Sequence, residues 1–271
     1  MSGGRSAARA AHRASIAAAS LALARRALRN SFRRPQFLAP LLVFPTMFLA
    51  VNVGGLDAAT RLPRFEQGSD GMLDFQLAAA ITQSLLIGGV GAGIAVGLEL
   101  QLGFFDRLVA APIPRVAIVL GRMASTAVLS ALQVAWFVAL GLAFGAEIEG
   151  GVPGVLLILL IGVVAGVGFG AIGQALAFAA RDPSIVQGIF PLVFVILFVS
   201  SAFFPRALLD PPASWVADYN PLSYIAEGMR DPIVEGIDAA TVLEGLGAAA
   251  GIALVAAGLA VVALRGRLRE A

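Results

Sequence analysis

The sequence contains no cysteine, no lysine and a single histidine, and these scarcities narrow the chemistry that the chain can perform. Without cysteine there is no disulfide, thiolate nucleophile or cysteine metal site. All 19 basic residues are arginine, so a Walker A loop, which needs a lysine on the terminal phosphates, is excluded. The one histidine, His12, lies in a basic tail. We therefore expect no catalytic, nucleotide-binding or metal-binding residues here, and no cofactor bound by this chain.

Charge is missing from long stretches of the sequence. Only 13% of the residues are charged, roughly half the usual share of a soluble domain, and 59% are hydrophobic. Six stretches of 20 to 31 residues hold no charged residue. A helix needs about 20 apolar residues to cross the hydrocarbon core of a bilayer. The sequence therefore predicts an all-α membrane protein with six spans within 35–264, at about 36–55, 75–98, 120–145, 153–178, 185–204 and 243–264.

The arginines are distributed unevenly between the predicted connections. If both termini lie inside, the inside segments hold 15 of the 19 arginines and only 4 of the 17 acids. Such enrichment of arginine on the cytoplasmic side is the positive-inside rule. We expect cytoplasmic termini, a short cytoplasmic tail over 265–271, and a place in a bacterial inner membrane, because arginine without lysine is typical of GC-rich genomes. The loop 57–74 carries no motif that we can interpret.

The N-terminal segment is rich in arginine and has no acid, a composition that an organelle transit peptide would share. We favour a disordered tail over 1–14 followed by an interfacial helix over 15–34. Leu21 and Phe32 share one face of that helix, with arginines about a quarter turn away. The helix can therefore lie along the inner leaflet with its apolar side down. Pro35 would end it where the first span begins.

Polar residues inside the predicted spans are few and uncharged, which disfavours proton relays and coupled-ion sites. Such residues are more often hydrogen-bond partners between helices than contacts for a substrate. The candidates for a substrate path are Gln83, Gln133, Gln174 and Gln187. Glycines recur every fourth residue at 89–97 and at 162–170, which predicts closely packed helix faces. The run 168–173 also matches G-x-G-x-x-G, but no strand precedes it, so a dinucleotide site is not expected.

The connection after the second predicted span is too long for a tight turn. Phe104 and Leu108 are four residues apart, and so are Phe105 and Val109, so a short helix here would carry an apolar ridge. We expect this helix over 99–112, with prolines at its end. It would expose both phenylalanines to a groove on a partner protein. The alternative is that it rests on the bilayer surface.

The segment 205–232 is a proline-rich excursion that cannot span a membrane. Asn220 suits the N-cap of a short helix and Pro221 its first position. Trp215 and Tyr224 suit the headgroup layer. An ordinary interfacial loop would explain prolines and aromatics, but not their order in this segment.

The two segments together resemble one family, the type-2 ATP-binding-cassette (ABC) exporter permeases, and most of all its daunorubicin-resistance branch. In that family the inner segment is the coupling helix, which docks on a separate ATPase subunit. The resemblance implies that Gly103 to Leu108 sit on the ATPase, while Glu99 and Arg115 brace the helix at the membrane. Pro114 stands where the family often has serine or threonine. The matching residues are Glu99, Gly103, Phe104, Phe105, Asp106, Arg107, Leu108, Pro112, Pro114 and Arg115.

The outer segment is similar to the family pattern F-x-P … N-P-hydrophobic-x-Y … R that precedes the last span. There the stretch forms short re-entrant helices that close the outer end of the path. By this resemblance an outer gate would be formed by Phe204, Pro205, Pro211, Asn220, Pro221, Tyr224 and Arg230. The resemblance covers nearly the whole chain.

The resemblance implies a permease subunit of an ATP-driven ABC exporter, without enzyme activity of its own. Two copies, or this chain and a paralogue, would form the path above two ATPase subunits. The expected cargo is amphipathic or hydrophobic, such as a drug, a lipid or a secondary metabolite. A lipid-linked polysaccharide exporter and a non-transporting assembly or anchor protein are the alternatives. Nucleic acid is not an expected partner, because the basic residues follow the membrane topology.

Overall fold

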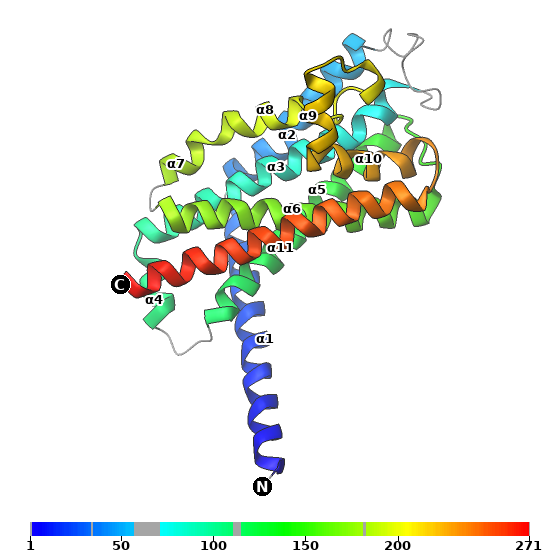
Figure 1. Cartoon of the computed structure of the whole chain (residues 1–271). Helices are drawn as coiled ribbons and strands as arrows, with labels where there is room; N and C mark the ends of the chain where they lie inside the picture. The colour runs from blue at the N-terminus through cyan, green and yellow to red at the C-terminus, as the bar shows by residue number, and fades with distance from the viewer. Residues whose placement is uncertain (1, 34, 57–70, 111–114, 181–182, 271) are drawn as a thin grey trace.

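The computed structural model describes the chain except for residues 1, 34, 57–70, 111–114, 181–182 and 271 (Figure 1). The described residues form helices and no β-strand, as expected for an all-α protein. A short 3-10 turn, η2 (Arg206–Leu208), lies between α8 and α9. In chain order the helices are α1 (Ser2–Arg33), α2 (Pro35–Leu56), α3 (Met72–Gln101), α4 (Phe104–Ala110), α5 (Arg115–Ala143), α6 (Gly151–Ala180), α7 (Pro183–Gly188), α8 (Phe190–Phe198), α9 (Ala213–Tyr219), α10 (Pro221–Val234) and α11 (Ala239–Glu270).

Five helices in the described part of the chain are long and apolar enough to cross a membrane, namely α2, α3, α5, α6 and α11. They coincide with five of the six predicted spans. The sixth, 185–204, is occupied by α7 and α8, which are separated at Ile189. Pro191 explains the break, because it lacks an N–H and its ring crowds the carbonyl of Gln187. The apolar part, Ser184–Phe198, covers only about 22 Å of the ~30 Å required, so helix length does not confirm a count of six.

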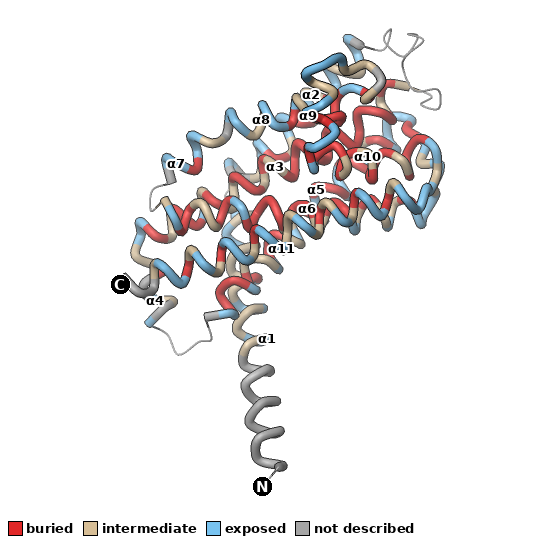
Figure 2. The backbone as a smooth tube through the Cα atoms, viewed as in Figure 1, coloured by how far each residue is buried: buried red, intermediate tan, exposed pale blue. Residues whose placement is uncertain are grey.

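The centre of the bundle is formed by α3 and α6, while α2 and α11 bury much less of their surface (Figure 2). The predicted glycine face at 89–97 packs against the backbone of α6, whereas the predicted face at 162–170 packs against side chains of α5. A Cβ added to Gly89 would lie 2.7 Å from the carbonyl carbon of Phe169, and one added to Gly93 would lie 2.6 Å from the carbonyl oxygen of Gly173. Only glycine permits such an approach of two backbones. The glycine spacing therefore predicted a close helix contact correctly.

The first helix, α1, runs away from the bundle at a steep angle to the spans (Figure 1). Its second half packs on α5, where a Cβ added to Gly121 would lie 2.8 Å from the backbone oxygen of Ser20. The helix begins at Ser2, whereas disorder was expected over 1–14 from the sequence. This segment is rich in alanine, the strongest helix former, which favours continuing the helix toward the N-terminus.

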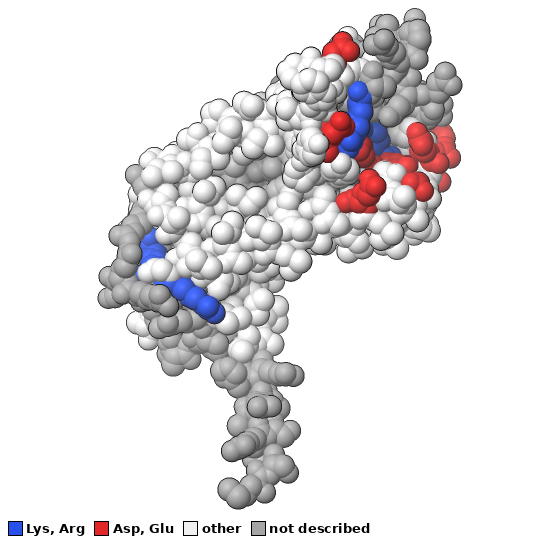
Figure 3. Space-filling view, viewed as in Figure 1, with Lys and Arg blue, Asp and Glu red and all other residues white. Residues whose placement is uncertain are grey.

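Charged side chains of the described residues gather at the two ends of the bundle, and the face shown in Figure 3 has none in its middle. We call the end that holds α4 and the C-terminus of α11 the basic end, and the opposite end, which holds α9 and α10, the acidic end. Arginines at the basic end include Arg26, Arg107, Arg122, Arg265 and Arg267. Acids at the acidic end include Glu147, Glu149, Asp210, Asp218, Glu227, Asp231, Glu235, Asp238 and Glu244.

Candidate functional site

The inner connection forms a sharp corner at the basic end. The span α3 continues through Glu99 to Gln101, so the first part of the predicted helix 99–112 belongs to the span itself. Gly103 then adopts a left-handed backbone with φ of +64°, which glycine tolerates without strain, and α4 begins at the next residue. The two predicted helix-ending prolines, Pro112 and Pro114, lie outside the described residues.

The two phenylalanines of α4 face different ways, rather than forming the single exposed ridge that the sequence predicted. Phe105 is 2% exposed, and its ring centroid lies 5.6 Å from that of Phe178 on α6. Leu108 packs against the same buried cluster. Phe105 therefore anchors α4 to the bundle, and the exposed Arg107 lies on the free side of the helix.

One carboxylate joins three helices beside α4. Glu99 on α3 accepts a hydrogen bond from Nη2 of Arg122 on α5, and its other oxygen lies 3.7 Å from Nη1 of Arg26 on α1. The Arg26 guanidinium also stacks on Phe104, with Cζ 3.4 Å from the ring centroid. Glu99 thus ties α3 to α1 and α5 at this corner. The side chains of Asp106 and Arg115, expected in the same segment, lie outside the described part of the chain.

At the acidic end, Asn220 caps α10 as predicted. Its Oδ1 accepts a hydrogen bond from the Leu222 N–H at 3.0 Å, and Pro221 occupies the first position of the helix. Its Nδ2 donates to the Ile196 carbonyl at 2.8 Å. One side chain therefore both starts α10 and ties it to the last turn of α8.

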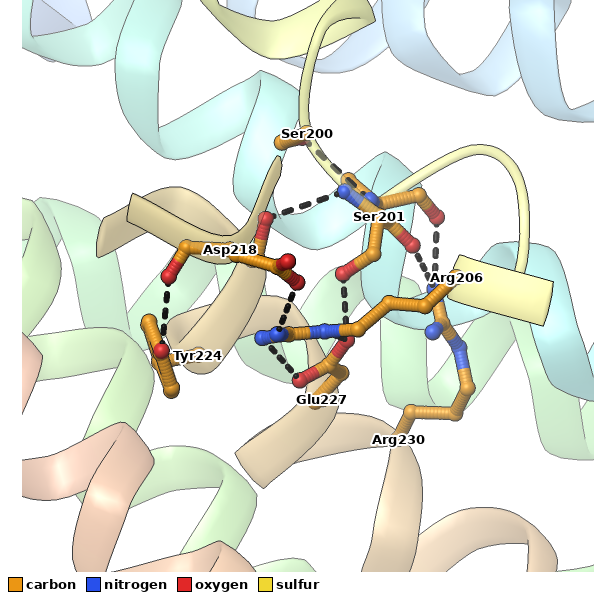
Figure 4. Close-up of polar contacts among 9 residues, drawn as sticks. Ser200, Ser201, Arg206, Asp218, Tyr224, Glu227 and Arg230 are labelled. Atoms are coloured by element: carbon orange, nitrogen blue, oxygen red, sulfur yellow. Dashed lines mark hydrogen bonds and ion pairs between the residues drawn. The ribbon is translucent and has the colours of Figure 1, made fainter. Parts of the chain in front are cut away.

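Arg206 lies at the centre of a polar cluster that the sequence analysis did not single out (Figure 4). Its Nε and Nη2 donate to the two carboxylate oxygens of Glu227 at 2.7 and 2.9 Å, and Nη1 donates to Asp218 at 3.0 Å. The Tyr224 ring lies 4.8 Å from its Cζ, and the Tyr224 hydroxyl donates to the Asp218 carbonyl at 2.7 Å. Hydrogen bonding to Glu227 raises the pKa of Arg206 above its ordinary value, so this residue stays charged.

Arg230 holds the irregular backbone between α8 and η2. It is 5% exposed, and its Nη2 donates to the carbonyls of Ser201 and Ala202 at 3.1 and 2.6 Å. Its Nε donates to the Phe75 carbonyl at 3.3 Å, and its guanidinium stacks on the Phe75 ring at 3.7 Å. The chain can therefore turn back at Ser201 without leaving these buried carbonyls unsatisfied.

The residues predicted for the outer gate are brought only partly together. Asn220, Tyr224 and Arg230 contribute to the contacts that fix α10, and Pro205, which directly precedes Arg206, is buried. Phe204 is 42% exposed, and Pro211 is also exposed and joined to Pro212 by a cis peptide bond. The sequence did show that Arg206 and Glu227 carry opposite charges within one short segment. Their spacing alone did not indicate that the two side chains form a pair.

The four predicted glutamines do not share one surface. Gln187 is exposed on α7, while Gln174 on α6 and Gln133 on α5 are buried. Gln83 on α3 is 1% exposed, and neither of its amide atoms has a hydrogen-bond partner among the described residues. Such an amide is unusual, because buried polar groups are nearly always paired.

The chain is similar to a known family of membrane proteins. The family model described as ABC-2 type transporter matches residues 18–234, which run from α1 through α10. The daunorubicin resistance ABC transporter permease protein DrrB1 of Streptomyces coeruleorubidus is 26% identical over 81% of this chain and 76% of its own length. The putative transport permease ycf38 of Porphyra purpurea is 28% identical over 77% of this chain and 72% of its own length. This chain therefore belongs to the ABC-2 type transporter family, as a multi-pass membrane permease.

Proposed function

We propose that this chain is the membrane-spanning subunit of an ATP-driven exporter, and that α4 receives the force from a separate ATPase. The observation that carries this proposal is a short helix fixed rigidly at the basic end of the bundle. Phe105 anchors α4 to α6, and Phe104 is held under Arg26. A chain without lysine cannot hold a Walker A site, so ATP hydrolysis belongs to a partner chain.

The basic end is the cytoplasmic end in this proposal, and the membrane is the inner membrane of a bacterium. Arg107 lies on α4 and Arg26 contacts Phe104 of the same helix, whereas the opposite end is mainly acidic (Figure 3). This is the asymmetry that the positive-inside rule describes. Both termini are then cytoplasmic, and α1 lies along the inner leaflet, where the exposed Leu21 and Phe32 contact acyl chains.

The sixth crossing is made by α7, α8 and the irregular residues that follow them. Backbone without helical hydrogen bonds is tolerated at membrane depth only when protein groups satisfy it. Arg230 and Asn220 supply donors here, and so does Gln76, whose Nε2 donates to the Phe203 carbonyl at 3.3 Å. The turn η2 with α9 and α10 then forms a re-entrant hairpin over 205–232 that closes the outer end.

The cargo in this proposal is an amphipathic or hydrophobic compound, such as a drug, a lipid or a secondary metabolite. The spans carry few charges in the described residues, which suits such a compound better than a small ion. The name of one relative, a daunorubicin resistance permease, supports a drug-like cargo. Two copies, or this chain and a paralogue, would pair through α2 and α8, whose exposed phenylalanines include Phe44 and Phe198. Buried glutamines such as Gln83 would contact the cargo when the path opens.

The test is co-purification with an ATPase that carries a Walker A lysine, detected by labelling with azido-ATP. Arg107→Glu reverses a charge on the free side of α4 without touching the buried Phe105, and we expect it to lower ATPase recovery about tenfold. Arg265→Glu, at the same end of the bundle on α11, is the matched control and should retain the ATPase. Equal recovery with both variants would contradict the assignment of α4 as the contact.

A further inference from the structure

The helices α1 and α4 are far apart in the sequence but meet through one side chain. Arg26 on α1 stacks on the Phe104 ring of α4 at 3.4 Å and lies 3.7 Å from the Glu99 carboxylate on α3. Its neighbours Arg25 and Arg29 are exposed, whereas Arg26 turns toward the protein. A guanidinium is suited to this position, because it can stack on a ring and pair with a carboxylate at once.

Among the described residues, side chains of α4 attach it to two other helices, α6 and α1. Phe105 attaches it to Phe178 on α6, and Phe104 attaches it to α1. Gly103, with its left-handed backbone, separates α4 from α3, so the two do not form one continuous helix. Glu99 is fixed in turn by Arg122, so Arg26 has a rigid counter-charge to hold it in place.

We propose that Arg26 is a positioning residue that makes α1 and α4 move as one body. A displacement of α4 would then be delivered to α1, and through it along the surface of the inner leaflet. Without the arginine, α4 could move while α1 stayed in place. The contact itself follows from the geometry alone, while its role in transport rests on the proposed function.

We call the contact of Arg26 with Phe104 and Glu99 the joint between α1 and α4. Its rigidity can be tested on the chain by itself. Because the sequence has no cysteine, spin labels can be placed at Leu21→Cys on α1 and at Ala110→Cys at the end of α4, where both native side chains are exposed. We expect a narrow distance distribution, at least doubled in width by Arg26→Gln. Arg26→Lys keeps the charge over the ring and should keep the distribution narrow, and the exposed Arg29→Gln is the matched control. An unchanged width in Arg26→Gln would overturn the joint.

The role of the joint is tested in the complex with the ATPase, with labels at Leu21→Cys and at Leu243→Cys, which is 66% exposed near the acidic end of α11. We expect a non-hydrolysable ATP analogue to shift this distance in the otherwise native chain. Arg26→Gln should retain ATPase binding within about twofold but lose more than half of the shift, and Arg26→Lys should restore it. A full shift in Arg26→Gln, or none in the native complex, overturns the transmission. Failure of the ATPase to bind the native chain would instead refute the proposed function, while the first measurement still decides the joint.

Discussion

At the scale of single residues, Gln83 differs from its two polar neighbours in α3. Thr82, its neighbour, donates to the Ala78 carbonyl at 2.8 Å, and Ser84 donates to the Leu41 carbonyl at 2.6 Å. The Gln83 amide has no such partner among the described residues. A buried polar group left unpaired costs about 1–3 kcal/mol, so retaining an amide here is costly unless another conformation uses it.

We therefore predict that Gln83→Leu stabilises the permease in its present conformation, by about 1–3 kcal/mol, because it removes an unpaired amide from the core. Thermal unfolding in detergent measures this, and Thr82→Val, at an equally buried but paired position, should change stability little. If Gln83 contacts cargo, the more stable variant will also transport less. A loss of stability in Gln83→Leu would show that the amide is paired.

The burial of Phe105 was the feature of the candidate site that the sequence could predict least. The spacing of four residues groups Phe104 with Leu108 and Phe105 with Val109, and both pairs fit a short helix. Periodicity alone does not tell which face of such a helix meets the protein, since that depends on Phe178, more than 70 residues later. Asn220 was easier, because its capping role depends only on the two residues that follow it.

At the scale of secondary structure elements, the lengths of the uncharged stretches predicted five spanning helices correctly. For the sixth stretch they predicted one long helix, where the structure has two shorter ones. The stretch 183–205 is free of charge, yet Pro191 interrupts its helix and the chain turns back at Ser201. A run of apolar residues shows that a segment can enter a membrane, but not that it does so as one continuous helix. The donors that allow the break, Arg230 and Gln76, come from other helices and were invisible to a local pattern.

The pairing of Arg206 with Glu227 ties the segment after α8 to α10. We predict that Glu227→Gln weakens the fold by about 1–3 kcal/mol, because a bidentate, charge-assisted pair is replaced by a neutral amide. The matched control is Glu235→Gln, an exposed acid at the end of the same helix. Limited proteolysis between η2 and α9 should be faster in Glu227→Gln only. Equal cleavage in both variants would mean that the pair does not hold this segment.

At the scale of the whole molecule, the charges of the described residues separate into a basic and an acidic end, as the sequence predicted from its connections (Figure 3). This separation of charges could be predicted from the sequence, because it depends on composition along the chain and not on contacts between helices. The path itself could not be read in this way. It depends on how helices from distant segments meet and, in the proposed exporter, on a second subunit.

The orientation of the whole molecule gives the last prediction, and the native lack of cysteine makes it direct. Leu102→Cys lies beside α4 at the basic end, and Tyr219→Cys lies on α9 at the acidic end, where the native side chains are 74% and 90% exposed. A maleimide that cannot cross membranes should label Tyr219→Cys in intact cells and Leu102→Cys only in inverted vesicles, because the proposed orientation puts the arginine-rich end in the cytoplasm. The cysteine-free native chain is the control. Labelling of Leu102→Cys from outside would put α4 on the side without ATP, where no ATPase could drive it.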